Sequence, residues 1–224
     1  MGAFPSTQWT LLSQIAAEDP RRQAAWQELA VRYRPAIRRY LAWALGAQDA
    51  DDHVQEFLLR SLRDDWWTRA ERERGHFRGF LKVLLDRYIA NARAHQRVRG
   101  PTLEFDPEHH PGDSRKAEAM YDRAFVAALT ERALGTIEAD YARRGRSAAF
   151  QTLKPLLLDG EYGDHGAAAR ALDMTPNAFA AALLRLRRAL TRAMRAELAS
   201  LLSDTGDLEH EWSELGRILG PDEP

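Results

Sequence analysis

Basic side chains gather in two stretches of this 224-residue chain, and both are candidates for binding a polyanion. The first stretch runs from Arg74 to Arg99 and contains a single acid, Asp86. Lysine and arginine neutralise backbone phosphates, and aromatic rings such as Phe77 and Tyr88 can stack on unpaired bases. The pattern therefore indicates a nucleic-acid surface, although a solvated helix face would look the same. The basic residues of this stretch are Arg74, Arg78, Lys82, Arg87, Arg93, Arg97 and Arg99.

The second basic stretch, between Asp164 and Met194, has the pattern of a helix-turn-helix. A short helix with small side chains ends near Asp173. Thr175 and Pro176 then supply an N-cap and a proline at the first helical position. The following helix can bury its phenylalanine and leucines and present the other side to DNA, although an ordinary helical hairpin is the alternative. The residues left for a DNA groove or for phosphates are Thr175, Asn177, Ala180, Ala181, Leu184, Arg185, Arg187 and Arg188.

Catalytic and metal-binding patterns are missing from the sequence. Cysteine is absent, which excludes thiol nucleophiles, disulfides and thiolate metal sites. The pair His109-His110 has no third or fourth ligand nearby, and His210-Glu211 is not followed by the second histidine of a zinc-protease motif. No glycine-rich phosphate loop or nucleophile elbow occurs. We therefore expect no enzymatic activity, no catalytic residue, no cofactor and no metal.

Hydrophobic periodicity predicts that helices position these residues, in an all-α fold. Apolar residues recur at three- and four-residue steps before Pro35 and again after it, which predicts two helical segments meeting at a bend. A short amphipathic helix follows, with acidic residues at its start. The clearest helix begins at Phe77 and keeps its period to Ala92. No sustained period of two argues for a strand.

Composition shifts divide the chain into two small helical domains joined by an extended acidic linker. The linker, residues 99–120, contains Pro101, Pro107 and Pro111 and no apolar period. It separates a first domain, 20–98, from a second, 121–202, whose helix-turn-helix covers about 164–195. Residues 1–19 form an N-terminal segment, and residues 203–224 an acidic tail with a short amphipathic helix. Without a signal peptide or membrane span, we expect a cytoplasmic protein.

The stretch GAQDADDHVQEFLLRSL, from Gly46 to Leu62, resembles conserved region two of extracytoplasmic-function sigma factors of bacterial RNA polymerase. The basic helix after it and the distal helix-turn-helix stand where this family has its promoter-melting helix and its region four. The opening FPSTQWTLL and the segment ERGHFRGFL are similar to one subgroup with a longer loop before the melting helix. The resemblance extends from Phe4 to about Leu202.

This resemblance implies two partners, core RNA polymerase (β′ clamp helices and β subunit) and promoter DNA. The polymerase contacts would be Asp49, Asp52, Gln55, Glu56, Leu59 and Arg60. A loop from Asp64 to Gly75 would hold a flipped base of the minus-10 element, and the acidic linker would follow the RNA-exit path. The residues expected at the minus-10 strand are Trp66, Trp67, Phe77, Arg78, Lys82, Arg87, Asn91 and Arg93. The alternative role of the acidic residues is to cap the helix. The alternative role of the tryptophans is to anchor the core or the loop.

Region four would read the minus-35 element in the major groove, and here the sequence departs from the family. Asp173 replaces the usual glycine of the turn, and Ala180 and Ala181 stand where polar readers are common. Few side chains can therefore make bidentate base contacts, so arginines gripping phosphates would dominate. The contact set would be Thr175, Asn177, Ala181, Leu184, Arg185, Arg187 and Arg188.

Two other functions fit the same residues. The chain could be a stand-alone helix-turn-helix regulator that binds duplex DNA without polymerase, or a polymerase-binding protein that reads no promoter. The activity of the protein could be controlled in three ways: by an anti-sigma factor, by the acidic tail, or by a protein kinase acting on Ser61 or Thr68.

Overall fold

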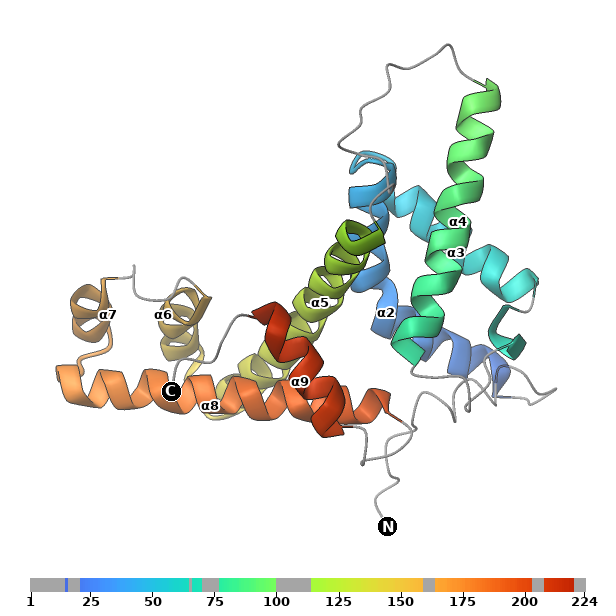
Figure 1. The fold of residues 1–224 in the computed structure, drawn as a ribbon. Helices are drawn as coiled ribbons and strands as arrows, with labels where there is room; N and C mark the ends of the chain where they lie inside the picture. The colour runs from blue at the N-terminus through green and yellow to red at the C-terminus, as the bar shows by residue number, and fades with distance from the viewer. Residues whose placement is uncertain are drawn as a thin grey trace. The chain divides into compact units, whose positions relative to one another are not determined.

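The computed structural model describes residue 15 and residues 21–64, 66–69, 77–99, 114–158, 164–202 and 208–219. These residues contain helices and no strand, which confirms the prediction of an all-α fold. Within them, no helix has both the length and the apolar character that a membrane crossing needs. Figure 1 shows the order α2 (Arg22–Leu45), α3 (Ala50–Arg63), the 3-10 helix η1 (Trp66–Arg69), α4 (Phe77–Arg99), α5 (Ser114–Arg143), α6 (Ser147–Leu158), α7 (His165–Ala171), α8 (Pro176–Leu201) and α9 (Leu208–Leu219).

Contacts divide the chain into two compact units, one made of residues 1–128 and 199–224 and the other of residues 129–198. The first border between the units, after residue 128, falls inside α5, whereas the sequence predicts a domain border at residue 121. The prediction of an extended linker is wrong for residues 114–120, which begin α5 because Ala117 is buried in the core along with Tyr121. Residues 100–113 of that predicted linker lie outside the described residues.

An aromatic cluster forms the centre of the first unit. The ring centroids of Tyr33 and Phe77 are 4.7 Å apart, and Trp67 stacks on Phe77 at 6.2 Å. Tyr121 meets Tyr40 edge to face at 5.3 Å. All five rings are buried. Because such ring pairs contribute about 0.5–1.5 kcal/mol each beyond area burial, the cluster ties α2, η1, α4 and α5 together.

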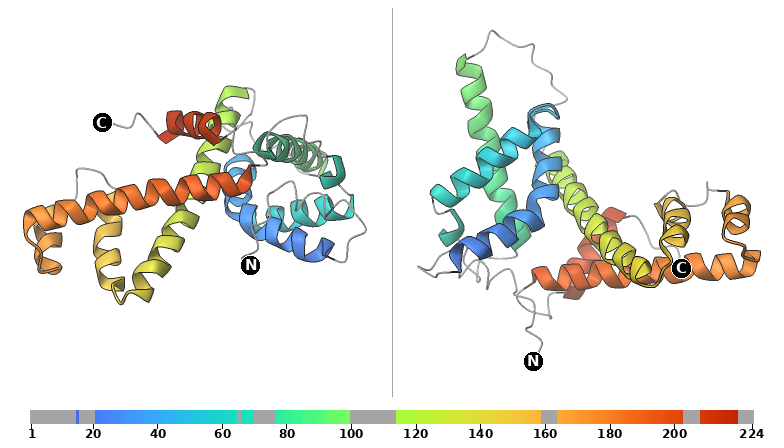
Figure 2. Two further views of the ribbon diagram at one scale, coloured as in Figure 1. Left: turned by 90° about the horizontal axis from the view of Figure 1, so that it is seen from below. Right: turned by 180° about the vertical axis from the view of Figure 1, so that it is seen from behind.

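The two segments that the sequence predicts around Pro35 form one helix, α2, which bends along its length (Figures 1 and 2). α2 runs from Arg22 to Leu45 with Pro35 inside it. An interior proline removes a backbone hydrogen bond and costs about 3 kcal/mol. Burial of Leu29 and Tyr33 before the proline and of Ile37 after it offsets this cost, so the helix continues.

The second unit packs the latter part of α5 with α6, α7 and α8 around one apolar core. Figures 1 and 2 show α6 and α7 on the same side of α8. With seven residues, α7 is too short to be stable alone, and Ala169 and Leu172 join the core that contains Phe179. The buried members of this core are Leu134, Ile137, Phe150, Leu153, Leu156, Ala169, Phe179, Ala182, Leu183 and Leu186.

Two turns of the second unit end their helices in the same way. Gly145 after α5 has a φ of 67°, and Asp173 after α7 has a φ of 52°. The Gly145 N–H donates to the Ala142 carbonyl at 2.9 Å, and the Asp173 N–H donates to the Arg170 carbonyl at 3.1 Å. This Schellman arrangement favours glycine, since a left-handed φ costs other residues about 1–2 kcal/mol. Asp173 thus occupies a glycine position in the turn between α7 and α8.

The predicted amphipathic helix near the end of the chain is α9. Leu215 is buried, as the periodicity predicts, and Trp212 is half-buried. Glu211 is also buried, with only 4% of its surface exposed, which the sequence pattern does not predict.

Candidate nucleic-acid and partner surfaces

One face of α3 carries the side chains that the resemblance assigns to the polymerase. Leu59 is 63% exposed, although an isolated surface leucine would mean little. Here it lies within a stripe of polar and charged side chains that recurs at helical spacing along the solvent-facing side of α3. The stripe consists of the exposed Asp49, Asp52, Gln55, Glu56 and Leu59 and the half-buried Arg60. We call these six residues the α3 stripe.

The start of α3 is held to α2 by an ion-pair cluster that sequence reasoning missed. Asp51 accepts hydrogen bonds from Arg34 at 3.2 Å and from Arg38 at 3.0 Å. These two arginines lower the pKa of the Asp51 carboxyl below its ordinary value. Asp49 stands at the N-cap position, but its side chain makes no capping hydrogen bond. The carboxylate of Asp49 therefore remains directed to solvent, as a partner contact requires.

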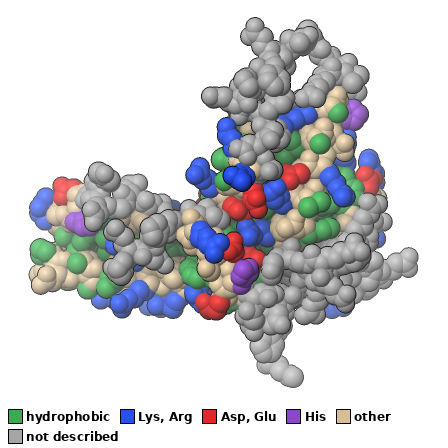
Figure 3. Space-filling model, in the orientation of Figure 1, with side chains coloured by type: hydrophobic (Ala, Val, Ile, Leu, Met, Phe, Trp, Pro, Cys, Tyr) green, Lys and Arg blue, Asp and Glu red, His purple; other side chains and the backbone are tan. Residues whose placement is uncertain are grey.

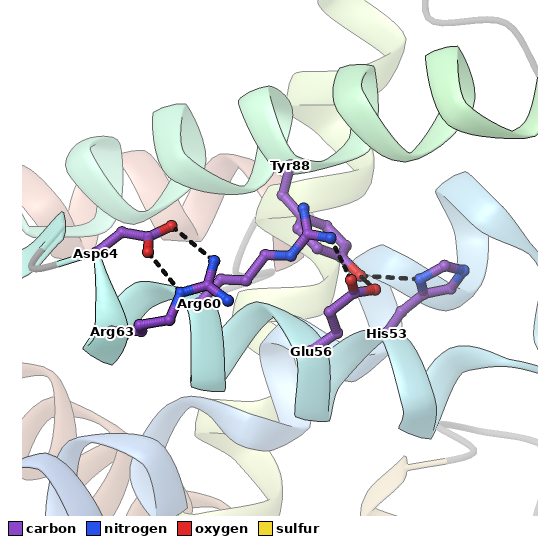
Figure 4. A network of polar contacts seen from close by, with 6 residues as sticks. All are labelled: His53, Glu56, Arg60, Arg63, Asp64 and Tyr88. Atoms are coloured by element: carbon purple, nitrogen blue, oxygen red, sulfur yellow. Dashed lines mark hydrogen bonds and ion pairs between the residues drawn. The ribbon is translucent and has the colours of Figure 1, made fainter.

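A polar network behind the α3 stripe holds Glu56 in place (Figure 4). Tyr88 of α4 donates its hydroxyl hydrogen to Glu56 Oε2 at 2.9 Å, and Arg60 donates to Glu56 Oε1 at 2.5 Å. His53 Nδ1 lies 3.0 Å from the same hydroxyl, so this nitrogen carries the proton if Tyr88 donates to Glu56. Burial, aided by the carboxylate, raises the pKa of Tyr88 and keeps the phenol protonated. The network fixes the α3 stripe on α4.

Trp67 and Phe77 belong to the core, which corrects their assignment to the minus-10 strand. Their exposed fractions are 1% and 3%. The Trp67 indole Nε1 donates to Ser61 Oγ at 3.0 Å, and Ser61 donates to the Leu58 carbonyl at 2.8 Å. Neither ring can stack on a base in this structure. Because Ser61 is itself 0% exposed, it is also closed to the kinase that the sequence suggested.

Trp66 is the one aromatic ring of the predicted base-holding loop that remains partly accessible among the described residues. It is half-buried and meets Phe57 edge to face, with ring centroids 5.7 Å apart. Residues 65 and 70–75 of the loop lie outside the described residues, as does the side chain of Thr68. A base pocket in this loop stays a prediction.

Arg78 and Lys82 lie on α4 as predicted, but acids of the chain occupy both. Arg78 forms an ion pair with Asp122 of α5, and its Nε lies 3.4 Å from Glu211 Oε2 of α9. Lys82 pairs with Asp86 one turn along its own helix, at 2.8 Å. Burial raises the pKa of Asp122, and Arg78 opposes this shift. Sequence reasoning missed Asp122 and Glu211 because both are remote from α4 in the chain.

The remaining predicted strand contacts differ in exposure. Arg87 and Asn91 are exposed and make no hydrogen bond or ion pair within the described part of the chain. Arg93 is half-buried and donates to the Ala44 carbonyl, in the last turn of α2, at 2.6 Å. Arginine at this position satisfies a helix-end carbonyl and so has a structural task. Arg87 and Asn91 are therefore the members of this set most open to a ligand.

The start of α8 has the N-cap and the first-position proline that the sequence predicts. Thr175 caps it, its Oγ1 accepting a hydrogen bond from the Ala178 N–H at 3.3 Å. Asn177 is exposed, Leu184 is 48% exposed and Ala181 is half-buried. Phe179 is buried against the core of the second unit, as predicted. The exposed side of the first turns is therefore small and apolar, with one amide.

Further along α8, arginines point to solvent. Arg185, Arg187 and Arg188 are exposed, and none forms an ion pair with another described residue. Arg192 extends the same row and is exposed. Figure 3 shows basic side chains gathered along the lower side of α8. We call Arg185, Arg187, Arg188 and Arg192 the α8 arginines; their unpaired charge suits a phosphate backbone.

No group of three or more histidine or acidic side chains among the described residues could hold a metal ion. The His109-His110 pair lies outside those residues. Comparisons with protein-family models, with curated proteins and with solved structures found no match to this chain. The arrangement of the side chains is therefore the basis for assigning a function.

Proposed function

We propose that this chain is a sigma factor of the extracytoplasmic-function type, which binds core RNA polymerase in the cytoplasm and directs promoter recognition, DNA melting and transcription initiation. The observation that carries the proposal is the capped helix-turn-helix of α7 and α8, in which Arg185, Arg187 and Arg188 form no ion pair with another described residue. Such a helix enters the major groove with its N-terminal end while basic side chains grip the flanking phosphates.

The α3 stripe gives the proposal its second element. A polar helix face with an exposed leucine, held rigidly from behind by Tyr88 and by the ion pairs of Asp51, suits a stable protein partner. The resemblance assigns this face to the β′ clamp helices of the polymerase, with the β subunit beside it. Arg87 and Asn91 of α4 are then available to the melted minus-10 strand.

Transcription in a purified system tests the proposal. The chain and core RNA polymerase are incubated with a pool of duplex templates of random upstream sequence, and new transcripts are sequenced. We expect transcripts that share an upstream motif and that require both the chain and core polymerase. If the chain adds no transcript above those made by core polymerase alone, the proposal is wrong.

A stand-alone helix-turn-helix regulator is the second candidate, because the α8 arginines are already exposed in the free chain. Such a regulator would bind a specific duplex without polymerase. A selection of random duplexes on the chain alone separates the two functions. A single enriched motif bound at physiological salt without polymerase would favour the regulator, whereas salt-sensitive binding without a motif fits the sigma factor.

A further inference from the structure

Three helices of the first unit converge on the guanidinium group of Arg78. α4 contributes Arg78 itself, α5 contributes Asp122, and α9 contributes Glu211. The guanidinium also lies 6.0 Å from the ring centroid of Phe125, and Tyr121 donates its hydroxyl hydrogen to the Arg78 carbonyl at 2.8 Å. The site thus has a cation, an aromatic wall and two carboxylates.

The burial of these groups shows how strongly they depend on one another. The exposed fractions of the side chains of Arg78 and Asp122 are 20% and 19%, and that of Glu211 is 5%. Removing a carboxylate from water is costly unless a cation or hydrogen-bond donors compensate it. Arg78 is a cation that compensates the buried Glu211, and α9 meets α4 through this ion pair, while Leu215 of the same helix is also buried.

Charge makes α9 resemble the ligand expected at α4. Glu209, Glu211 and Glu214 lie along this twelve-residue helix, whose basic residue in the last turn is Arg217. A guanidinium binds carboxylate and phosphate through the same planar array of donors. A nucleic-acid strand that approached Arg78 would thus meet a site already filled by a chemically equivalent anion.

We propose that α9, residues Leu208–Leu219, is the resident occupant of the Arg78 site and that a nucleic-acid backbone binds there only by displacing it. This inference rests on the proposed function, since it takes a nucleic-acid strand as the competing ligand. The Lys82–Asp86 pair differs, because its acid belongs to α4 itself and also accepts a hydrogen bond from Tyr40 of α2 at 2.7 Å. Asp122 of α5 also pairs with Arg78, and Glu211 is the contact through which α9 limits access to it.

Substitution of Glu211 by glutamine tests whether α9 occupies the Arg78 site in competition with a nucleic-acid strand. The Glu211→Gln chain keeps the shape of the side chain and loses its charge, and Glu214→Gln is the matched control because Glu214 pairs with Arg217 on its own helix. Fluorescence anisotropy measures binding of a labelled, mixed-sequence single strand of about 20 nucleotides, longer than one binding site. Hydrogen exchange of the α9 amides is followed in the same samples, at low salt.

We expect Glu211→Gln to bind the strand roughly tenfold more tightly than the natural chain, the ratio for one lost charge-assisted contact, and Glu214→Gln to bind as the natural chain does. Adding the strand to the natural chain should also speed exchange in α9. If Glu211→Gln alone leaves α9 seated, the double variant Glu211→Gln/Leu215→Asp removes its apolar contact as well.

Two results would overturn the inference, and they are distinguishable. Release of α9 with unchanged affinity for the strand would mean that α9 does not compete at Arg78, and the proposed function would stand. Failure of every variant to bind the strand would contradict both the inference and the assignment of α4 to DNA.

Discussion

Two basic helices of this chain present their charges in opposite ways. On α4, Arg78 and Lys82 are paired with Asp122, Glu211 and Asp86. On α8, the arginines at 185, 187 and 188 have no ionic partner among the described residues. In Figure 3, acidic and basic side chains intermingle on the first unit, whereas basic side chains line α8. The number of basic residues in a stretch therefore does not measure the charge that a ligand meets.

Packing explains the difference. Arg78 is largely buried between side chains of α5 and α9, so its charge must be compensated inside the protein. The α8 arginines lie on the outer side of a helix whose opposite side forms the core, and water solvates them. Access to Arg78 thus requires a rearrangement, while Arg87 of α4 and the α8 arginines are exposed as they stand.

The largest expected effect is the loss of stability when Trp67 is removed from the core of the first unit. If this ring is a core residue of the first unit, Trp67→Ala should lower the free energy of unfolding by about 3–5 kcal/mol. Urea unfolding followed by far-UV circular dichroism measures it. Trp66→Ala is the control, since Trp66 is half-buried and should cost clearly less. A Trp67→Ala chain as stable as the natural one would return this ring to the DNA-facing set.

The second prediction concerns the α8 arginines. The double variant Arg185→Ala/Arg188→Ala should bind duplex DNA roughly tenfold or more weakly, and its salt dependence should fall by about two units of slope. Duplex binding titrated at several salt concentrations gives both values. Arg143→Ala/Arg144→Ala removes the same charge from arginines that pair with Asp140, and it should change the affinity little. Equal losses in the two double variants would show that only net charge matters.

The all-α fold class was predictable from this sequence, because burial of apolar side chains at helical spacing decides it, whereas the start of α5 falls in the predicted linker. The α3 stripe and the capped start of α8 follow from local patterns for the same reason. The partners of Arg78 were not predictable, since Asp122 and Glu211 meet it only through tertiary packing. For Trp67 and Phe77, ring type suggested stacking on bases, while the size of the rings made them core residues.

The third prediction sharpens the comparison by testing the turn that presents α8. Gly145→Ala places a side chain at a φ of 67° and should destabilise the second unit by about 1 kcal/mol. Asp173→Gly relieves the same strain in the turn before α8 and should stabilise the unit by less than about 1 kcal/mol, because glycine gains more freedom on unfolding. Thermal unfolding of both variants checks the signs. A destabilising Asp173→Gly would mean that the aspartate side chain has a task in this turn.

The smallest expected effect concerns how stability depends on pH through the ion pairs of Asp51 that hold the start of α3 to α2. Arg38 and Arg34 lower the folded-state pKa of Asp51 below its ordinary value of 3.8, so the ionised carboxylate stabilises the folded state. That contribution is complete well above 3.8 and is lost as the pH falls through the lowered pKa. The melting temperature of the natural chain should therefore fall slightly more than that of Asp51→Asn between about pH 6 and about pH 3. Parallel curves for the two chains would show that these exposed pairs contribute nothing measurable.

Binding to core RNA polymerase tests the central claim most directly. Immobilised core enzyme is titrated with the natural chain, with Leu59→Asp, and with Val31→Asp, which places the same charge on an apolar residue of α2 that is somewhat more exposed than Leu59. We expect tight binding by the natural chain and by Val31→Asp, and at least roughly tenfold weaker binding by Leu59→Asp, as for a central interface residue. Absence of binding by the natural chain, or equal binding by all three, would contradict the account.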